Sequence, residues 1–210
     1  MTRLLDFHSH HLDAPAGSAI VNLPLEVLSG ATPFAPLPHA CYSVGIHPWW
    51  SSLPPAELAQ LQQQLPLWAA RDEVVALGEC GFDRLRGDWA VQEQLFPPHV
   101  RLSEAYGKPL ILHCVRAFDR LLALRKHYRP TQRWVIHGFR GRPALARQLL
   151  QADFDLSFGD HYNAESYALT PPSRRHIESD EGRLPAALLS TPTICLLYTS
   201  DAADERSSVD

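Results

Sequence analysis

Short runs of apolar residues alternate with amphipathic stretches along most of this chain. Within each run the apolar residues are continuous rather than alternating, as they are in strands that are buried on both faces. Strand-like runs separated by helix-like stretches are typical of βα units that form a parallel sheet. Eight such runs occur, at residues 4–10, 18–23, 41–47, 74–80, 109–114, 133–138, 154–159 and 176–180.

Four of the stretches between the runs predict helices, because their apolar residues recur at helical spacing. Pro54 and Pro143 stand near the starts of two of them, where the missing N–H of proline costs nothing. Pro97 and Pro98 stand inside another and predict a kink or a restart of that helix. The predicted helices span residues 54–71, 89–106, 118–127 and 143–151.

This order of elements predicts an α/β fold, a closed (β/α)8 TIM barrel, over residues 1–189. The 210 residues fit one domain, at the short end for such a barrel. The last segment, CLLYTSDAADERSSVD, resembles translated vector or sequencing-adaptor sequence. We therefore expect residues 190–210 to be a non-native or disordered tail, and the last helix of the barrel to be missing or replaced.

Imidazole and carboxylate side chains stand at the ends of several of the apolar runs. In a parallel barrel the carboxyl ends of all strands open onto one mouth, where active sites lie. The H-x-H spacing adds to this, because residues two apart on a strand share a face. A single histidine at a strand end is more often structural, but packing does not explain five such ends. The predicted metal ligands are His8, His10, Glu79, His113, His137 and Asp180.

This set of ligands indicates a particular chemistry. Imidazole nitrogens and carboxylate oxygens suit Zn²⁺, Mn²⁺ and related divalent ions, and we expect two or more ions of Mg, Mn or Zn. Glu79 can bridge two ions, which together activate a water and hold the oxygens of a displacement at phosphorus. Asp180 can bind metal and also accept the proton of the attacking water. Glu79 and Asp180 are therefore the predicted catalytic residues.

Charge and cysteine content add information only about particular parts of the chain. The net charge of −4 does not indicate a polyanion partner, but nine Lys and Arg lie between Arg116 and Arg147. Most of them fit solvated helix faces, whereas Arg116 and Arg140 stand near strand ends and can reach the mouth. Strand alternation turns Cys80 and Cys114 away from the mouth, which excludes a Cys–His nucleophile. With no CxxC spacing, signal peptide or membrane span, we expect a cytoplasmic protein with reduced thiols.

Seven motifs, in this order and spacing, resemble the TatD family of metal-dependent deoxyribonucleases, within the amidohydrolase-like barrels. The resemblance extends over residues 4–181, and its short loops are similar to those of a compact bacterial branch. The motifs are DFHSHHLD at residues 6–13, GIHPWW at 45–50, LGECGFD at 77–83, PLILHCVRAFD at 109–119, WVIHGFRG at 134–141, LSFG at 156–159 and ESD at 178–180.

The resemblance implies a divalent-metal phosphodiesterase that acts on DNA and trims single strands from the 3′ end. It implies the same six metal ligands, and it suggests that His47 and Arg116 lie near substrate phosphate. No membrane or obligate protein partner is expected. Two alternatives stay open, because a fold does not fix a substrate. They are a related hydrolase of a small phosphoester, lactone or amide, and a non-catalytic metal-binding scaffold. A groove with basic or aromatic rims would favour the nuclease, with Trp49, Trp50, Arg116 and Arg140 as the candidate residues.

Overall fold

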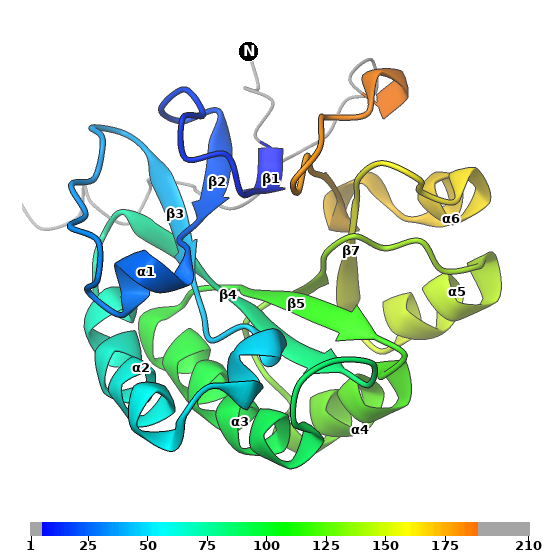
Figure 1. Ribbon diagram of the computed structural model, residues 1–210. Helices are drawn as coiled ribbons and strands as arrows, with labels where there is room; N and C mark the ends of the chain where they lie inside the picture. Colours follow the sequence, from blue (N-terminus) through cyan, green and yellow to red (C-terminus); the bar gives the residue numbers. More distant parts are fainter. Residues whose placement is uncertain (1–5, 189–210) are drawn as a thin grey trace, which may run out of the picture.

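The computed structural model describes residues 6–188, in which eight parallel strands follow one another around a barrel (Figure 1). Each strand pairs with the next one along the chain. The predicted (β/α)8 barrel is confirmed, and each of the eight runs contains or overlaps a strand. The strands are β1 (Asp6–Ser9), β2 (Ala19–Asn22), β3 (Cys41–Val44), β4 (Val74–Asp83), β5 (Leu110–Val115), β6 (Trp134–Ile136), β7 (Phe154–Phe158) and β8 (Arg175–Ile177).

The four predicted helices are present, and shorter helices occur between them. Of the kink or restart predicted at Pro97 and Pro98, the restart is wrong, because α3 is one helix through both residues. Burial of Leu95, Phe96 and Val100 stabilises that helix against the unfavourable prolines. The helices are α1 (Leu25–Leu28), η1 (Pro48–Ser52), α2 (Pro55–Ala69), α3 (Trp89–Tyr106), α4 (Phe118–Tyr128), α5 (Pro143–Gln151), α6 (Ala164–Leu169), η2 (Pro172–Arg174) and η3 (Ala186–Leu188).

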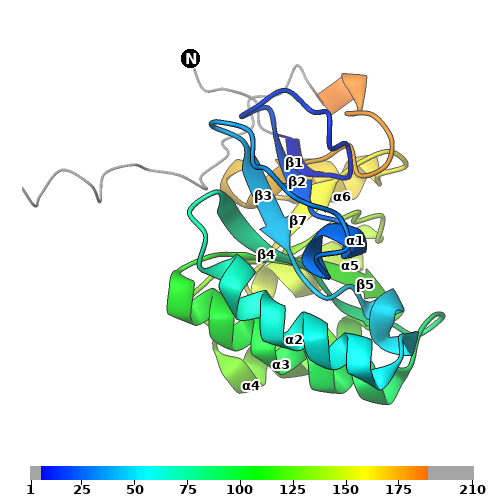
Figure 2. The ribbon, with the colours of Figure 1, turned by 60° about the vertical axis from the view of Figure 1, so that its left-hand side comes forward.

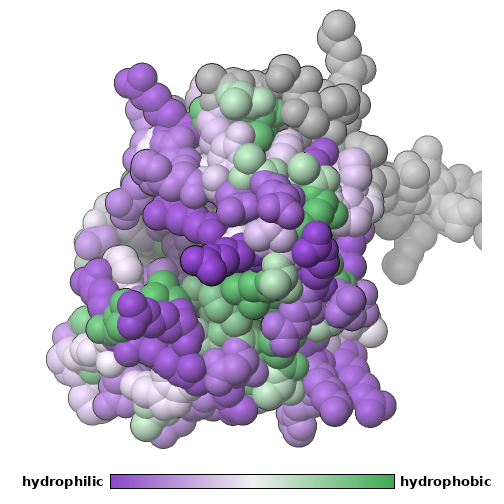
Figure 3. Space-filling model, turned by 90° about the vertical axis from the view of Figure 1, so that its right-hand side faces the viewer, coloured by the Kyte–Doolittle hydropathy of each residue, from purple (hydrophilic) through white to green (hydrophobic). Residues whose placement is uncertain are grey.

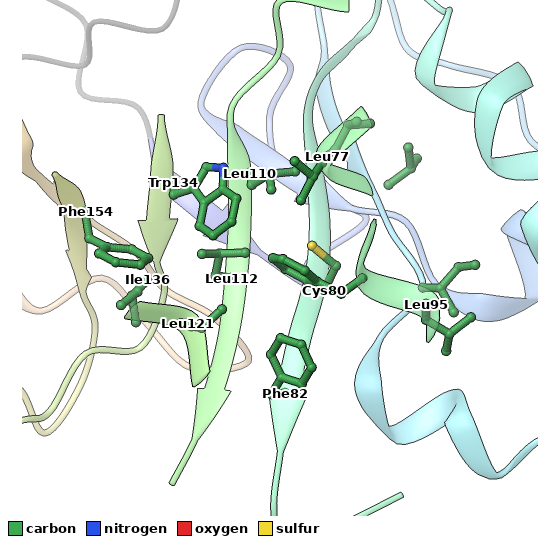
Figure 4. Close-up of a cluster of buried hydrophobic side chains, with 14 of the residues drawn as sticks. Leu77, Cys80, Phe82, Leu95, Leu110, Leu112, Leu121, Trp134, Ile136 and Phe154 are labelled. Carbon is green, nitrogen blue, oxygen red and sulfur yellow. The ribbon is translucent and has the colours of Figure 1, made fainter. Parts of the chain in front are cut away.

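Two apolar layers hold the barrel together. The inner one fills the barrel itself with Phe7, Ile20, Ala76, Ile111 and Val135. The outer and larger one lies between the strands and the helices that cover them. Figure 4 shows part of the outer layer, which includes Leu77, Cys80, Phe82, Leu95, Leu110, Leu112, Leu121, Trp134, Ile136 and Phe154.

Helices cover the barrel unevenly. Helices α2, α3 and α4 lie side by side along one side of it (Figure 2), whereas the strands β1 and β2 are followed only by loops and the four-residue α1. Hydrophilic residues cover most of the face over α5 and α6, with smaller hydrophobic areas among them (Figure 3). None of the helices in residues 6–188 is long and apolar enough to cross a lipid bilayer. The tail predicted at residues 190–210 lies outside the described residues.

The barrel closes where β1 meets the segment that follows β8. Ser9 and Asp180 form a parallel bridge. The backbone N–H of His10 donates to the carbonyl of Asp180, and the N–H of Asp180 donates to the carbonyl of His8, both at 3.0 Å. These bonds bring His8 and His10 next to Asp180 at the carboxyl end of the barrel.

Candidate metal centre

Glu79, on β4, lies at the centre of the polar cluster at the mouth and is 4% exposed. One carboxylate oxygen, Oε2, lies 3.0 Å from Nε2 of His10 and 3.2 Å from Nε2 of His8. The other oxygen, Oε1, lies 2.6 Å from Nε2 of His137 and 3.1 Å from Nδ1 of His113. The structure therefore brings these five predicted ligands together, and it divides four histidines into two pairs, one for each oxygen.

The inward orientation of Glu79 depends on an irregularity in β4. Ala76 belongs to the inner apolar layer and Leu77 to the outer one, so strict alternation would turn Glu79 outward with Leu77. The register of β4 with β5 shifts between Leu77 and Cys80, and beyond the shift Cys80 is the residue in the outer layer. Glycine permits the close approach of β3 here, because a Cβ on Gly45 would lie 2.5 Å from the carbonyl oxygen of Glu79. The predicted outward orientation of Cys80 is thus observed.

Asp180 completes the cluster from the segment after β8. Its Oδ1 lies 3.6 Å from Nε2 of His10 and 3.9 Å from Nε2 of His8, and its side chain is one third exposed to the mouth. Its backbone φ is +54°, in the left-handed region, which aspartate adopts more often than most residues other than glycine. Within residues 6–188, three groups of residues offer ligand atoms that lie within 4.8 Å of one another. They are His8, His137 and Asp180; His8, His10 and Glu79; and His47, Glu79 and His113.

The buried imidazole of His8 tests whether these residues fit a metal ion. His8 is fully buried, and among the described residues its Nδ1 has no polar partner. Its Nε2 lies 3.2 Å from Oε2 of Glu79 but forms no hydrogen bond with it. A buried polar atom without a partner costs about 1–3 kcal/mol, so it needs a ligand or an unusual reason. A cation held between His8 and Glu79 would engage a nitrogen lone pair and the carboxylate at once. The donor set of nitrogen and oxygen atoms fits a divalent ion of the Zn²⁺ or Mn²⁺ type.

Charges in the cluster are strongly coupled. Burial alone would raise the pKa of Glu79, but the nearby imidazoles of His137 and His8 and the hydrogen bonds from His10 and His113 lower it well below its usual range. Burial would lower the pKa of His137, but the carboxylates of Glu79 and Glu178 raise it well above its usual value. The carboxylate of Glu79 is thus held ionised, which is the state that binds a cation.

Two buried carboxylates behind the cluster were missed by the sequence prediction. Glu178 is fully buried, accepts a hydrogen bond from the backbone N–H of Gly138, and lies 3.4 Å from Nδ1 of His137. Asp83 lies 3.4 Å from Nε2 of His113 and accepts a hydrogen bond of 2.6 Å from the indole of Trp49. Each carboxylate thus faces the second nitrogen of a predicted ligand, an arrangement that orients metal-binding imidazoles.

The sequence did carry a signal for both carboxylates. Asp83 stands at an even spacing from Glu79 on β4, and Glu178 stands two residues before Asp180. Even spacing is the same-face relationship that identified His8 and His10. Their partners, however, lie on other strands, and the spacing alone does not name them.

The three residues predicted to contact substrate also lie at the mouth. His47 caps η1 by accepting a hydrogen bond of 3.1 Å from the N–H of Trp49. Its Nε2 lies 3.3 Å from Nδ1 of His113 and 3.6 Å from Oε1 of Glu79. The imidazole of His47 therefore contacts the cluster directly and does not lie at the outer edge of the mouth. Burial lowers the pKa of His47 and outweighs its contact with Glu79. Arg116 and Arg140 are exposed and line a cavity that also contains His113.

Two cavities open on either side of the cluster. One has a volume of about 400 Å³, and the other about 540 Å³. Both are lined by Trp49, His113, His137 and Asp180, so they meet at the candidate metal centre. The larger one contains Arg116 and Arg140, and we call it the basic cavity. The smaller one contains Asn22, Pro24, Leu25, Glu26, Trp50 and Glu181, and we call it the acidic cavity.

Comparisons with known proteins place this chain in a family. The family model described as TatD related DNase matches residues 29–181. An uncharacterized metal-dependent hydrolase, YjjV of Escherichia coli, is 34% identical over 137 residues, which are 63% of this chain and 51% of the relative. A 3′-5′ ssDNA/RNA exonuclease, TatD of Cronobacter turicensis, is 37% identical over 130 residues, which are 60% of this chain and 48% of the relative. The chain spans about half the length of these curated relatives.

Solved structures are similar over a larger share of the barrel. The crystal structure of YjjV from Escherichia coli covers 84% of this chain and 78% of its own, with a TM-score of 0.65 and 25% identity. A TatD-family hydrolase from Entamoeba histolytica covers 84% of this chain and 73% of its own, with a TM-score of 0.61. At 17% identity the second structure supports the fold alone.

Proposed function

Because this chain belongs to the family of TatD-related DNases, we propose that it is a divalent-metal-dependent hydrolase of DNA phosphodiester bonds. The observation that carries the proposal is the division of Glu79 between two pairs of histidines. One carboxylate oxygen faces His8 and His10, and the other faces His113 and His137. A carboxylate used on both oxygens in this way suits two neighbouring cations, the arrangement of many phosphodiesterases.

The proposed ligands follow from these contacts. His8 and His10 would hold one ion together with one oxygen of Glu79, and His113 and His137 would hold a second ion together with its other oxygen. Asp180 adds an oxygen on the side of His8 and His10. When bound, divalent ions lower the pKa of a water and offset the charge that develops on phosphate oxygens.

The protein's own side chains supply the remaining steps. Asp180 is one third exposed at the mouth, so its carboxylate can meet the attacking water and accept its proton. Arg116 and Arg140 line the basic cavity and can pair with phosphates of the strand. His47, against Glu79 and His113, lies where it can donate to a phosphate oxygen.

The proposed substrate is single-stranded DNA, trimmed from its 3′ end. Relatives that carry the name 3′-5′ ssDNA/RNA exonuclease support this substrate. The two cavities support it as well, because a strand crossing the metal centre needs space on both sides. Hydrolysis of a small phosphoester, lactone or amide is the second candidate, since one relative is known only as a metal-dependent hydrolase. A cytoplasmic location is also part of the proposal, and the free thiols of Cys41, Cys80 and Cys114 among the described residues support it.

The test combines metal content with cleavage. We expect the purified chain to bind Mn²⁺ or Zn²⁺ by elemental analysis and to shorten a labelled single-stranded oligonucleotide when Mn²⁺ or Mg²⁺ is present. Glu79→Gln should lose both the metal and the cleavage. Asp72→Asn, which removes one exposed acid at the opposite end of the barrel, should retain both. Folded, metal-loaded protein that leaves DNA intact but hydrolyses a small phosphodiester would establish the second candidate instead.

A further inference from the structure

The two cavities beside the metal centre carry opposite charge. Outside the candidate ligands, the charged residues of the basic cavity are Arg116 and Arg140, and those of the acidic cavity are Glu26 and Glu181. Within residues 6–188, none of these four side chains forms an ion pair with another residue. Their charges therefore act on whatever enters the cavities.

The acidic cavity offers hydrogen-bond acceptors on an apolar wall. Asn22 is 6% exposed, and its amide nitrogen donates to Oγ of Ser43 at 3.0 Å and to the carbonyl of Gly78 at 2.7 Å. These two bonds fix the amide nitrogen, and no described residue donates to the amide oxygen of Asn22, which lines the cavity. Pro24, Leu25 and Trp50 supply the apolar surface. A ligand that fits must bring hydrogen-bond donors and a flat apolar group, and it must not bring negative charge.

We propose that the acidic cavity binds the terminal nucleoside of a DNA strand by its free hydroxyl, and that Glu26 and Glu181 exclude a terminal phosphate. This inference rests on the proposed function, because it assigns the two sides of a strand whose scissile phosphate lies at the metal centre. The sugar hydroxyl donates to Asn22, and the base packs on Leu25 and Trp50. The rest of the strand passes through the basic cavity, where its phosphates meet Arg116 and Arg140.

Charge makes this selection specific. A terminal phosphate carries about −1.5 to −2 charges at neutral pH, whereas a terminal hydroxyl carries none. Placing that phosphate beside Glu26 and Glu181 is unfavourable, and the penalty decreases with salt because both carboxylates are exposed. The enzyme should therefore process strands that end in a 3′-hydroxyl and resist those that end in a 3′-phosphate.

The experiment compares two oligodeoxynucleotides of one sequence, which end in a 3′-hydroxyl or a 3′-phosphate and carry a fluorophore at the 5′ end. We expect the metal-loaded protein to cleave the 3′-hydroxyl form about tenfold faster in kcat/KM at low salt. The double variant Glu26→Gln/Glu181→Gln should bring the two rates within about twofold of each other. Asp72→Asn, with a charge change far from the mouth, should keep the full preference. Fluorescence anisotropy in EDTA gives the same comparison for binding, without cleavage.

The outcomes separate this inference from the proposed function. Equal cleavage and equal binding of the two substrates would overturn the inference and leave the nuclease assignment intact. A preference for the 3′-hydroxyl that persists in the double variant would also overturn it, because the discrimination would then come from elsewhere. If neither substrate is cleaved, the nuclease assignment fails and this inference fails with it, whatever the anisotropy shows.

Discussion

At each end of the barrel a buried carboxylate lies among basic side chains, and the partners of Glu79 and Asp155 differ. At the mouth, Glu79 is surrounded by histidines, and the nitrogens of His8 have no hydrogen-bond partner in the described residues. At the opposite end, Asp155 on β7 accepts from Arg133 at 2.7 Å and from Arg174 at 3.0 Å. The third contact of Asp155 is with His176, at 3.3 Å.

The difference separates a structural site from one that can bind a ligand. Arginine is always charged and has no lone pair to offer to a cation. Arg133 and Arg174 can therefore donate hydrogen bonds to Asp155 but cannot bind a metal ion. Histidine can lose its proton and then offers a lone pair, so the cluster around Glu79 can release protons and bind cations in their place. A buried carboxylate is thus not by itself a sign of function. Two arginines neutralise Asp155, whereas the bases around Glu79 are all histidines, and this difference distinguishes the two roles.

The largest expected effect comes from removing each carboxylate in turn. Asp155→Asn should lower the free energy of unfolding by about 3 kcal/mol, because it leaves partly buried arginines without their partner. A divalent ion at a hundredfold excess over its Kd should still stabilise that variant by about 2.7 kcal/mol. Glu79→Gln should lose the response to the ion. Thermal unfolding with and without Mn²⁺ measures both quantities, and a response retained by Glu79→Gln would remove the distinction between the two ends.

A smaller effect is expected from acid. Burial raises the pKa of Asp155, but the contacts with His176 and Arg133 outweigh it and lower the pKa below its usual value. A lowered pKa means that ionised Asp155 stabilises the fold above about pH 4, and that this contribution is lost as the pH falls through the folded-state pKa. The difference in unfolding free energy between the wild type and Asp155→Asn should therefore shrink from pH 6 to pH 3. Urea unfolding in metal-free buffer measures it, and a constant difference would contradict the assignment.

The smallest effect should follow from Arg174→Lys. Arg174 donates to Asp155 and to the backbone carbonyls of Leu150 and Phe154, and a lysine cannot make the same set of bonds. We expect a loss of about 1 kcal/mol in unfolding free energy. The stabilisation by Mn²⁺ should not change, since Arg174 lies away from the mouth. A weaker response to Mn²⁺ in this variant would show that the two ends are coupled.

The strands were predictable because burial on both faces requires continuous apolar runs, and these are visible in the sequence. Short helices such as α1 and α6 were not predicted, since they have too few turns for a periodic pattern. The predicted restart of α3 at Pro97 failed because packing against the sheet outweighs local propensity.

The candidate site was predictable as a set of residue types at strand ends, but not as a set of contacts. Counting by twos from Leu77 places Glu79 on the wrong face, and only the register shift in β4 corrects it. Asp83 and Glu178 were missed because their partners, His113 and His137, lie on other strands. His47 was predicted to contact substrate, and its contact with Glu79 was not predicted, because His47 precedes η1 and Glu79 lies on β4.

The bridge between Ser9 and Asp180 has a consequence for assembly of the site. It joins the beginning of the barrel to its end, so the site is complete only when His8 and His10 have met Asp180 from the other end of the described chain. Contacts between positions so distant in sequence form slowly, because the intervening chain must be ordered first. Tight binding of a cation would then require a closed barrel. Partly folded chains would bind metal more weakly than fully folded ones.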